Sequence, residues 1–513
     1  MQSKIRTNHI IRSTGILMAA FLANKILAIG RQIVIAQTFG TGSQYDAFVA
    51  AFRLPDILFM LIAGGALGTA FIPILSERLT LKNPDDPDGW QLASSVLNSL
   101  LLVVILISIL MAIFAQPLVA WLIAPGFAPD IQRLTTNLMR LTLISTVIFS
   151  VSSLLGAILH TRQHFILPAI APLIYNLGIM FGAIFLAAPF GVYGLIYGVI
   201  LGAVGHLLVQ TPGLLRYGFH YHPCFGWSDR DLWQVARLMG PRVLNIVVIQ
   251  INFVVMFNLA SRLGTGSVSA LDYGWDLMQM PQTIIGSAIG IVLFPTLSEL
   301  AAQKDTDTLR RTMSQTLRIM LALAIPAMVG LIVLGRPIIR VIFERGEFGP
   351  ESTAAVYQAL QFWALGLIAH SALEVVNRVF YAQKDTITPF LSSVVSMVIN
   401  LGLALVLVQS LAAGGLALSN GIAVTVEVLI MLVIAHRRMA GVEAGSMLNT
   451  LIRTLLAAGA MGAVIIAFIT TAPGLSPLAA AAAGGVLGVS VYVGVGLLLG
   501  IEEIRLVPRL VGR

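Results

Sequence analysis

Three cations lie within long apolar stretches of the sequence: Lys25, Arg31 and Arg53. An ionisable side chain in such a stretch usually faces a cavity or a partner, because unpaired charge is costly to bury. The planar guanidinium of arginine matches phosphate oxygens with two hydrogen bonds, whereas lysine acts as a point charge. These three side chains are therefore candidates to bind an anionic group that has been taken out of water.

Helical spacing limits how the first two cations can act together. On a regular helix Lys25 and Arg31 point about 120° apart, whereas Asn24 and Arg31 share one face. Both cations can line one cavity only if the cavity is wide or the helix bends, and Gly30 is a candidate for the bend. Arg31 also lies near one end of its stretch, so it could instead extend to the membrane interface.

Two acids near these cations each permit two interpretations. Asp56 follows Arg53 at i+3, so the two could form a self-contained ion pair, or Asp56 could take part in gating. Asp46 could orient an arginine or gate the outer mouth of a cavity. It could equally be an acid near a helix N-terminus, where a negative charge is favourable.

A second polar cluster lies in a later apolar stretch. His370, Glu374, Asn377 and Arg378 fall at i, i+4, i+7 and i+8, which places them on one helical face. They could relay protons or couple ion movement to transport. Equally, Glu374 and Arg378 could form an internal pair that only stabilises a helix bundle.

Other polar residues in apolar stretches could coordinate sodium, although hydrogen bonds between helices are the commoner use of such amides. They are Asn245, Gln250, Asn252, Asn258, Asn400 and Glu427. The segment His220–Cys224 has metal-capable side chains without a second ligand cluster, and no nucleotide-binding signature occurs. We expect no enzyme activity, no metal site and no cofactor, with Na+, H+ or the membrane potential as candidate energy sources.

The composition is that of a polytopic membrane protein. Hydrophobic residues make up 57% of the chain and charged residues 11%, and the mean hydropathy is +0.91, far above that of soluble domains. The net charge of +8 comes mostly from loop arginines, so it does not indicate nucleic-acid binding. A single cysteine, Cys224, excludes an internal disulfide.

About 20 apolar residues cross a bilayer, and on that measure the sequence contains roughly fourteen spans. They are 10–37, 45–78, 92–123, 130–160, 165–188, 191–215, 232–262, 267–302, 310–335, 351–381, 386–409, 412–436, 447–471 and 477–500. The second is interrupted by prolines and the glycine-rich run Ala63–Gly68, which membrane helices tolerate only inside a bundle. We therefore predict an all-α bundle.

Lysine and arginine are concentrated in every second connection, as the positive-inside rule requires if the N-terminus is cytoplasmic. Arg78, Arg162, Lys304 and Arg437 are examples. The exception is Arg336–Glu351, which falls outside with three arginines that three glutamates offset locally. An even number of spans then places the C-terminus in the cytoplasm as well.

The sequence also contains an internal repeat. FIPILSE at Phe71–Glu77 matches LFPTLSE at Leu293–Glu299, and HTRQHFILP resembles YAQKDTITP, at offsets of about 222 and 221 residues. Because the offset covers six spans, an even number, the two copies point the same way across the membrane. We predict a six-helix lobe over 1–216, a parallel six-helix lobe over 217–440, and two further helices with a tail over 441–513.

Several long motifs are distinctive together. They are RLPDILFMLIAGGALGTAFIPILSE from Arg53, APGF at Ala124–Phe127, PAIAPLIYNLGIM at Pro168–Met180, LMQMPQTIIGSAIGIVLFPTLSE at Leu277–Glu299, ERGEFGPEST at Glu344–Thr353 and FYAQKDTITP at Phe380–Pro389. They resemble the MurJ (MviN) family of lipid II flippases in the MOP exporter superfamily. The resemblance implies fourteen helices in two lobes around a cationic cavity, a groove for a lipid tail formed by the two C-terminal helices, and a place in the bacterial cytoplasmic (inner) membrane.

The chain departs from this family at two places. Many members carry arginines just before the glycine-rich break of the second span and in the eighth span. This chain has Leu58-Phe59-Met60 and Trp275-Asp276-Leu277 there. Either the three cations of the first two spans suffice for the substrate, or the substrate differs from lipid II.

The predicted function is movement of lipid II from the inner to the outer leaflet by alternating access. The candidate binding residues are Lys25, Arg31, Arg53, Asn24 and Asp46, and the candidate gating or coupling residues are Asp56, His370, Glu374 and Arg378. The alternatives are a MOP-type exporter of another polyprenyl-diphosphate-linked oligosaccharide and a membrane enzyme acting on polyprenyl-phosphate lipids. Expected partners are the glycolipid, membrane lipids and other cell-wall synthesis proteins, with no nucleic acid.

Overall fold

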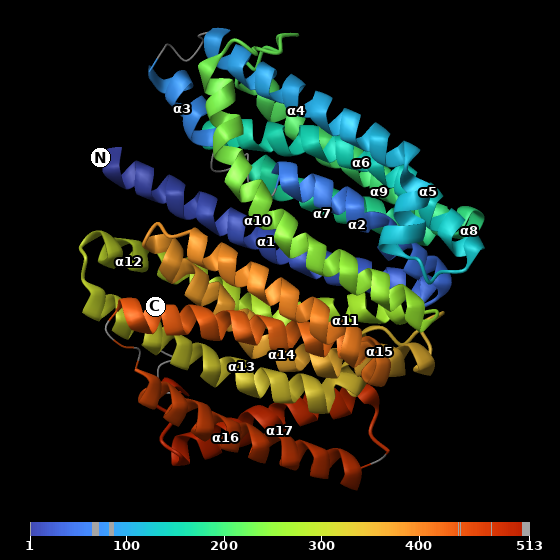
Figure 1. The fold of residues 1–513 in the computed structure, drawn as a ribbon, viewed down its shortest axis with the longest axis vertical. Helices are drawn as coiled ribbons and strands as arrows, with labels where there is room; N and C mark the ends of the chain where they lie inside the picture. The colour runs from blue at the N-terminus through green and yellow to red at the C-terminus, as the bar shows by residue number, and fades with distance from the viewer. Residues whose placement is uncertain are drawn as a thin grey trace. The chain divides into compact units, whose positions relative to one another are not determined.

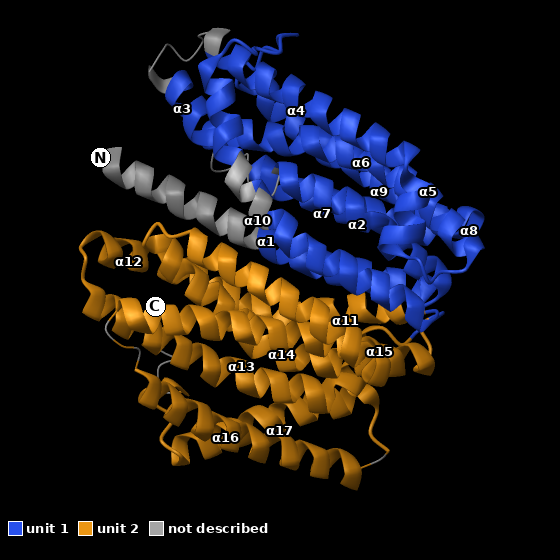
Figure 2. Ribbon diagram, in the orientation of Figure 1, with its two compact units in different colours: residues 1–265, 345–347 blue, residues 266–344, 348–513 orange. Residues whose placement is uncertain are grey.

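The computed structural model describes residues 2–63, 71–81, 87–439, 441, 443–472 and 474–504. Every regular element in these ranges is helical (Figure 1), which confirms the all-α prediction. The chain forms two compact units, Met1–Thr265 with Arg345–Glu347, and Gly266–Glu344 with Phe348–Arg513 (Figure 2). The lobe limits predicted from the repeat, 1–216, 217–440 and 441–513, are defined by sequence and remain a prediction.

The first unit is built from ten helices in its described residues. They are α1 (Gln2–Phe39), α2 (Ser43–Ala63), α3 (Ile72–Leu81), α4 (Pro87–Ile113), α5 (Ala115–Pro117), α6 (Pro129–Thr161), α7 (Ile166–Phe181), α8 (Ala187–Phe190), α9 (Val192–Arg216) and α10 (Arg230–Ala260), with π-helical turns at Leu118–Ile123 and Gly182–Leu186. α2 packs against α6, and α7 packs against both α1 and α9. Since α6 also packs against α9, the two cation-bearing helices α1 and α2 lie beside the same core of α6, α7 and α9.

The second unit is arranged around a central helix. Its helices are α11 (Ser267–Gln282), α12 (Ala288–Ala302), α13 (Thr306–Ile342), α14 (Pro350–Ala382), α15 (Ile387–Arg438), α16 (Ala444–Thr471) and α17 (Pro477–Leu498), with a π-helical turn at Thr283–Ser287. α14 packs against α11, α13 and α15, and α16 packs against α13 and α17. α15 runs through a sharp break at Ala412, so it contains both spans predicted at 386–409 and 412–436.

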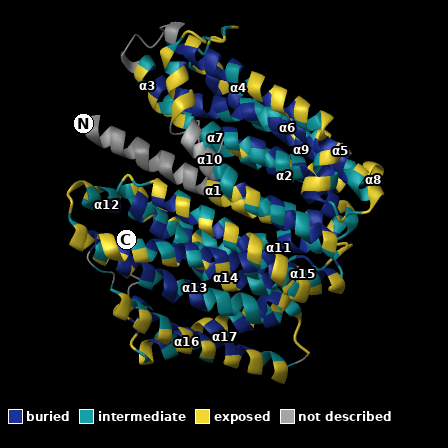
Figure 3. Ribbon diagram, viewed as in Figure 1, coloured by how far each residue is buried: buried dark blue, intermediate teal, exposed yellow. Residues whose placement is uncertain are grey.

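Eleven helices in the described part of the chain are long and apolar enough to cross a membrane. The exposed residues of these helices, coloured yellow in Figure 3, include many with large apolar side chains. On α4, for example, Val103, Leu106, Leu110 and Ile113 form an exposed stripe at helical spacing, which suits a lipid-facing surface. The multi-pass membrane prediction is confirmed, whereas the count of fourteen spans remains a prediction.

The internal repeat is present in the backbone at an offset of 221 residues. α6 and α14 begin with prolines at Pro129 and Pro350, a favoured residue for the first helical turn. The connections that follow contain the only described non-glycine pair at this offset with positive φ, Gln163 at 56° and Lys384 at 60°. The same backbone path is thus built twice from different residues.

In both copies, a side-chain contact between two equivalent positions joins this connection to the end of a later helix, α9 in the first copy and α15 in the second. In the first copy, Tyr217 and His164 are hydrogen-bonded at 3.3 Å between the tyrosine oxygen and Nδ1. In the second copy, the equivalent residues are Arg438 and Asp385, joined by an ion pair of 2.5 Å between Nη1 and Oδ2. The contact is therefore part of the repeated architecture, and its chemistry differs between the copies.

The ion pair between Arg438 and Asp385 should make the free energy of unfolding depend on pH. Burial opposes ionisation of Asp385, but hydrogen bonds from Thr388 and Arg438 outweigh burial and lower the pKa of Asp385 to about 2. Because the pKa is lower in the folded state than in the unfolded state, the stabilisation is present above the unfolded pKa and is lost as pH falls towards 2. We expect the melting temperature of purified protein to fall over this acid range, and the fall to be smaller in Asp385→Asn. An identical acid profile in that variant would contradict the assignment.

α7 and α9 approach each other through glycines. A Cβ atom on Gly182 would lie 2.7 Å from the Cα of Gly198, and one on Gly178 would contact the backbone of Gly202. Small residues four apart allow two membrane helices to pack backbone against backbone. This contact fixes the position of α7, which contributes Asn176 to the site described below.

The two C-terminal helices are held to α13 by a buried ion pair. Nε of Arg318 lies 2.6 Å from Oε1 of Glu503, which is 3% exposed, and Thr450 donates to the same oxygen at 3.3 Å. Glu502 also faces Arg318, at 3.5 Å, but is 80% exposed. Breaking a buried pair leaves an uncompensated charge, whereas an exposed pair contributes little.

We therefore expect Arg318→Met to lower the free energy of unfolding by about 3 kcal/mol or more. Glu502→Gln is the matched control and should change it by less than about 1 kcal/mol. Thermal unfolding of purified protein in one detergent measures both. Equal melting temperatures for the two variants would show that Glu503 does not depend on Arg318.

Candidate substrate-binding site

An amide on α7 joins two of the predicted binding residues on α1. Nη1 of Arg31 donates to Oδ1 of Asn176 at 3.1 Å, and Nδ2 of Asn176 donates to Oδ1 of Asn24 at 2.8 Å. Asn24 and Arg31 therefore share one face of α1, as the spacing predicted. Nε of Arg31 is buried and has no hydrogen-bond partner among the described residues, so the guanidinium is oriented and keeps a free donor.

Asn176 was not among the predicted site residues. It is the only amide in the apolar motif Pro168–Met180, and it is 4% exposed. A buried amide requires hydrogen-bond partners, and this was the available signal. The sequence could not show that α1 is the neighbour that supplies them.

The other two cations occupy different surroundings. Lys25 is exposed on α1, and α1 continues as one helix through Gly30. The Arg53 guanidinium carbon lies 3.6 Å from the centroid of the Phe257 ring on α10, a cation–π contact. α10 packs against α2 in this unit, and its aromatic ring was also missed by the sequence analysis. Binding roles for Lys25 and Arg53 remain predictions.

The two predicted acids both lie on α2. Asp46 is in the first turn of this helix and is 1% exposed, so it has the position of an acid at a helix N-terminus. Asp56 is half-buried one turn after Arg53. Their predicted roles in orienting an arginine or in gating remain untested.

The second polar cluster belongs to the other unit. Nη2 of Arg378 lies 3.4 Å from Oε2 of Glu374, which is the internal pair predicted as one alternative. Nε2 of His370 lies 3.1 Å from Oδ1 of Asn420 on α15. The pair and this contact between helices both fit a stabilising role, and a proton relay remains a prediction.

Aromatic rings lie in both triplets, Leu58-Phe59-Met60 and Trp275-Asp276-Leu277, where the resemblance led us to expect arginines. In the first unit Phe59 packs against Phe149, with 5.6 Å between ring centroids. In the second unit Trp275 packs against Trp363 at 4.7 Å and His370 at 5.3 Å. Both triplets thus contribute ring contacts, and neither contains a cation.

Two of the amides proposed as sodium ligands are engaged in hydrogen bonds. Asn258 donates to the carbonyl oxygens of Trp121 and Leu122 at 3.1 and 2.8 Å. Asn400 accepts from the Ser419 hydroxyl at 2.9 Å, across the break of α15. These amides serve helix packing, and a sodium site remains a prediction.

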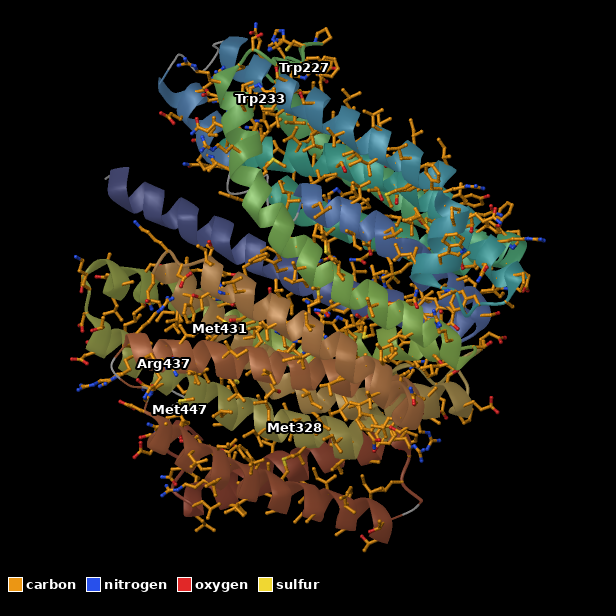
Figure 4. The ribbon with its side chains drawn as sticks, in the orientation of Figure 1. Trp227, Trp233, Met328, Met431, Arg437 and Met447 are labelled. Atoms are coloured by element: carbon orange, nitrogen blue, oxygen red, sulfur yellow. The ribbon has the colours of Figure 1, made fainter. Side chains whose placement is uncertain are left out.

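An apolar groove of about 600 Å³ lies between α13, α14, α15 and α16. Its walls include Met320, Leu365, Ala369, Leu432 and Leu448. His436 and Arg437 line it in the last turn of α15, and Arg437 and Met447 are labelled in Figure 4. Of the two C-terminal helices expected to form a lipid-tail groove, α16 lines it, and α17 contributes none of the described lining.

The decisive comparison is with a model of a protein family. The model described as "Lipid II flippase MurJ" matches residues 35–474, which is most of the chain. The chain belongs to the MurJ family. The resemblance seen in the motifs is therefore confirmed across both halves of the repeat.

Individual relatives agree with this assignment. "Lipid II flippase MurJ" of Burkholderia cenocepacia is 28% identical over 425 residues, covering 81% of this chain and 82% of that protein. "Probable lipid II flippase MurJ" of Vibrio cholerae is 31% identical over 403 residues, covering 77% of each. A solved structure of "Lipid II flippase MurJ, inward closed conformation" has a TM-score of 0.81 at 25% identity, covering 95% of this chain and 99% of that one.

A more distant structure identifies the wider group of folds. An inward-facing multidrug resistance MATE family transporter of the MOP superfamily has a TM-score of 0.67 at 14% identity, covering 81% of this chain and 94% of that one. This likeness concerns the fold alone, and membership of the MOP superfamily remains a prediction.

Proposed function

We propose that the protein flips lipid II, a lipid-linked peptidoglycan precursor, from the inner to the outer leaflet of the bacterial cytoplasmic membrane. The observation that carries the proposal is the network in which Asn176 orients Arg31 and leaves its buried Nε free, within a chain that matches the MurJ family model. A guanidinium held in this way can donate to a phosphate oxygen without giving up its orienting contact.

In this proposal the diphosphate contacts Arg31 first. Lys25 and Arg53 supply further positive charge, which replaces the hydration that the diphosphate loses inside the membrane. Asn24 and Asp46 complete the binding set, and Asp56, His370, Glu374 and Arg378 take part in gating or coupling. The polyprenyl tail, which is wholly apolar, lies in the groove lined by α13, α14, α15 and α16.

The repeat supports an alternating-access mechanism. In transporters built from parallel repeats, the substrate site lies at the repeat interface, and one lobe moves relative to the other. The distribution of lysine and arginine supports cytoplasmic N- and C-termini. An ion gradient of Na+ or H+, or the membrane potential, supplies the energy, and other cell-wall synthesis proteins are proposed partners.

Complementation tests this function in a bacterium whose own lipid II flippase can be shut off. We expect the protein to restore growth and to make lipid II accessible at the outer surface of the same cells. Lysis despite normal membrane levels of the protein would reject lipid II as the substrate.

The aromatic contacts of Phe59 and Trp275 favour one second candidate, the export of another polyprenyl-diphosphate-linked oligosaccharide. A less positive site would suit a glycolipid with fewer acidic groups outside the diphosphate. Accumulation of such a glycolipid inside cells that lack this protein, with normal lipid II export, would select the second candidate.

A further inference from the structure

The segment between α9 and α10 lies along α4 without forming a helix. We call residues 219–228 the strap. Nδ2 of Asn98 donates to the carbonyl oxygens of His222 at 3.2 Å and Cys224 at 2.7 Å. The Tyr221 hydroxyl donates to Oδ1 of Asn98 at 2.8 Å, and the His222 amide donates to the Ser94 hydroxyl at 3.0 Å. The strap is therefore fixed to α4 by both backbone and side chains.

These contacts occur at the start of a membrane span. The apolar span of α4 begins at Gly89, and its first turns carry a polar stripe at helical spacing. The stripe consists of Gln91, Ser94, Ser95, Asn98 and Ser99. At 1.5 Å per residue it covers about the first 15 Å of the span. Irregular backbone beside a membrane-spanning helix needs its polar groups satisfied by protein, and the stripe does this for the carbonyl groups of His222 and Cys224 and the amide of His222.

Two ion pairs hold the end of the strap, where the chain enters α10. Nη2 of Arg78 lies 2.7 Å from Asp229 and Nε lies 2.5 Å from Asp231. Burial lowers the pKa of Arg78, but the hydrogen bonds and charges of the two aspartates outweigh it and raise the pKa overall. Arg78 therefore stays charged, and the first turn of α10 is held in place.

Aromatic side chains project from this fixed segment. Trp227 and Trp233 are each 61% exposed, and Tyr221 and Phe225 are also exposed; the two tryptophans are labelled in Figure 4. Nε1 of Trp233 donates to the carbonyl oxygen of Trp227 at 2.8 Å, and the rings of Phe225 and Trp227 are 5.4 Å apart. Phe225, Trp227 and Trp233 are thus linked to one another, and Tyr221 lies on the same segment as Phe225 and Trp227.

Two arginines border the rings on α10. Arg230, Trp233 and Arg237 fall at i, i+3 and i+7, so they share one helical face. Both arginines are exposed, and neither forms an ion pair with a described residue. Their positive charge is therefore available to a partner from outside the chain.

We propose that this surface, formed by Tyr221, Phe225, Trp227, Arg230, Trp233 and Arg237, binds anionic phospholipid headgroups. Tryptophan and tyrosine rings are enriched at membrane interfaces, and arginines near an anionic leaflet are attracted to its phosphates. The strap lies against a helix that is long and apolar enough to cross a membrane, which favours a lipid over a soluble protein partner. This surface lies at the cytoplasmic leaflet if the N-terminus is cytoplasmic, as proposed above. Its binding of anionic lipid does not depend on lipid II being the substrate.

Tryptophan fluorescence in vesicles tests the proposal. The full chain is placed in phosphatidylcholine vesicles that contain brominated phosphatidylglycerol or, at the same mole fraction, brominated phosphatidylcholine. Trp227→Phe with Trp233→Phe isolates the signal of these rings by difference and keeps the surface aromatic. We expect the anionic quencher to reduce that signal at least about twofold more than the neutral quencher.

Charge variants complete the test. Arg230→Gln with Arg237→Gln should remove the preference for the anionic lipid, whereas Arg133→Gln, which changes an exposed arginine on α6, should retain it. Trp121→Phe removes the third exposed tryptophan of the described first unit and should also retain the preference. Equal quenching by the two lipids in the unmodified protein, or quenching by aqueous iodide with none by lipid, would overturn the proposal. The second result would place the surface in water, where a soluble partner could bind.

Discussion

Replacing Asn176 with leucine is expected to reduce transport by about 10-fold or more, although Asn176 carries no charge. Arg31 would lose the acceptor that orients it, and a hydrogen bond to a charged group contributes about 1.5–3 kcal/mol. Arg31→Ala should reduce transport at least as strongly while leaving a measurable remainder. Growth in the flippase-depleted bacterium and externally accessible lipid II measure both effects, with membrane levels of each variant checked.

A double-variant comparison separates this role from general damage. If Asn176 acts through Arg31, then Arg31→Ala with Asn176→Leu should be no worse than Arg31→Ala alone, because the two changes remove the same interaction. Arg133→Ala is the control for loss of a cation outside the site. Near-normal transport by Asn176→Leu, or additive losses in the double variant, would contradict the assignment.

Gly346→Ala is expected to lower both stability and complementation. Gly346 has φ of +58°, and a Cβ atom there would clash with the carbonyl oxygen of Gln37 at the end of α1. The adjacent Glu347 amide donates to the same oxygen at 3.0 Å. A left-handed conformation costs a residue with a side chain about 1–3 kcal/mol before any clash is counted.

The same motif supplies a matched control for this change. Gly349 has φ of −87° and open space around its Cβ position, so Gly349→Ala should leave the melting temperature nearly unchanged. Thermal unfolding of the two purified variants under identical conditions distinguishes them. Equal melting temperatures would mean that the contact with Gln37 does not constrain this segment.

The helical class and the shared face of Asn24 and Arg31 could be predicted because each depends on spacing within a short segment. The repeat could be predicted because its two copies keep similar short motifs. Asn176 and Phe257 could not be placed, since helical periodicity shows which residues share a face and not which distant helix covers it. The arginine-rich connection Arg336–Glu351 was an exception to the charge pattern. Its Arg340 pairs with Glu344 at 3.2 Å, as local compensation predicted.

The groove and the strap are two further features that could not be predicted from sequence patterns. The groove is lined by short pieces of four helices, and no single piece differs from an ordinary apolar segment. The polar stripe on α4 has a clear period, but its partner is an irregular segment more than 120 residues later. Long-range pairing of this kind is set by tertiary packing and leaves no local pattern.

The break in α15 bears on how the two halves diverged. Ala412 has φ of 49° and ψ of −130°, and its counterpart Gly191 has 56° and −139°. This region suits glycine, so the alanine is strained. The two halves thus keep the same backbone path at this point, although one carries glycine and the other alanine. The bend must then be imposed by packing between the helical segments before and after it, and the residue at its apex only has to tolerate the strained conformation.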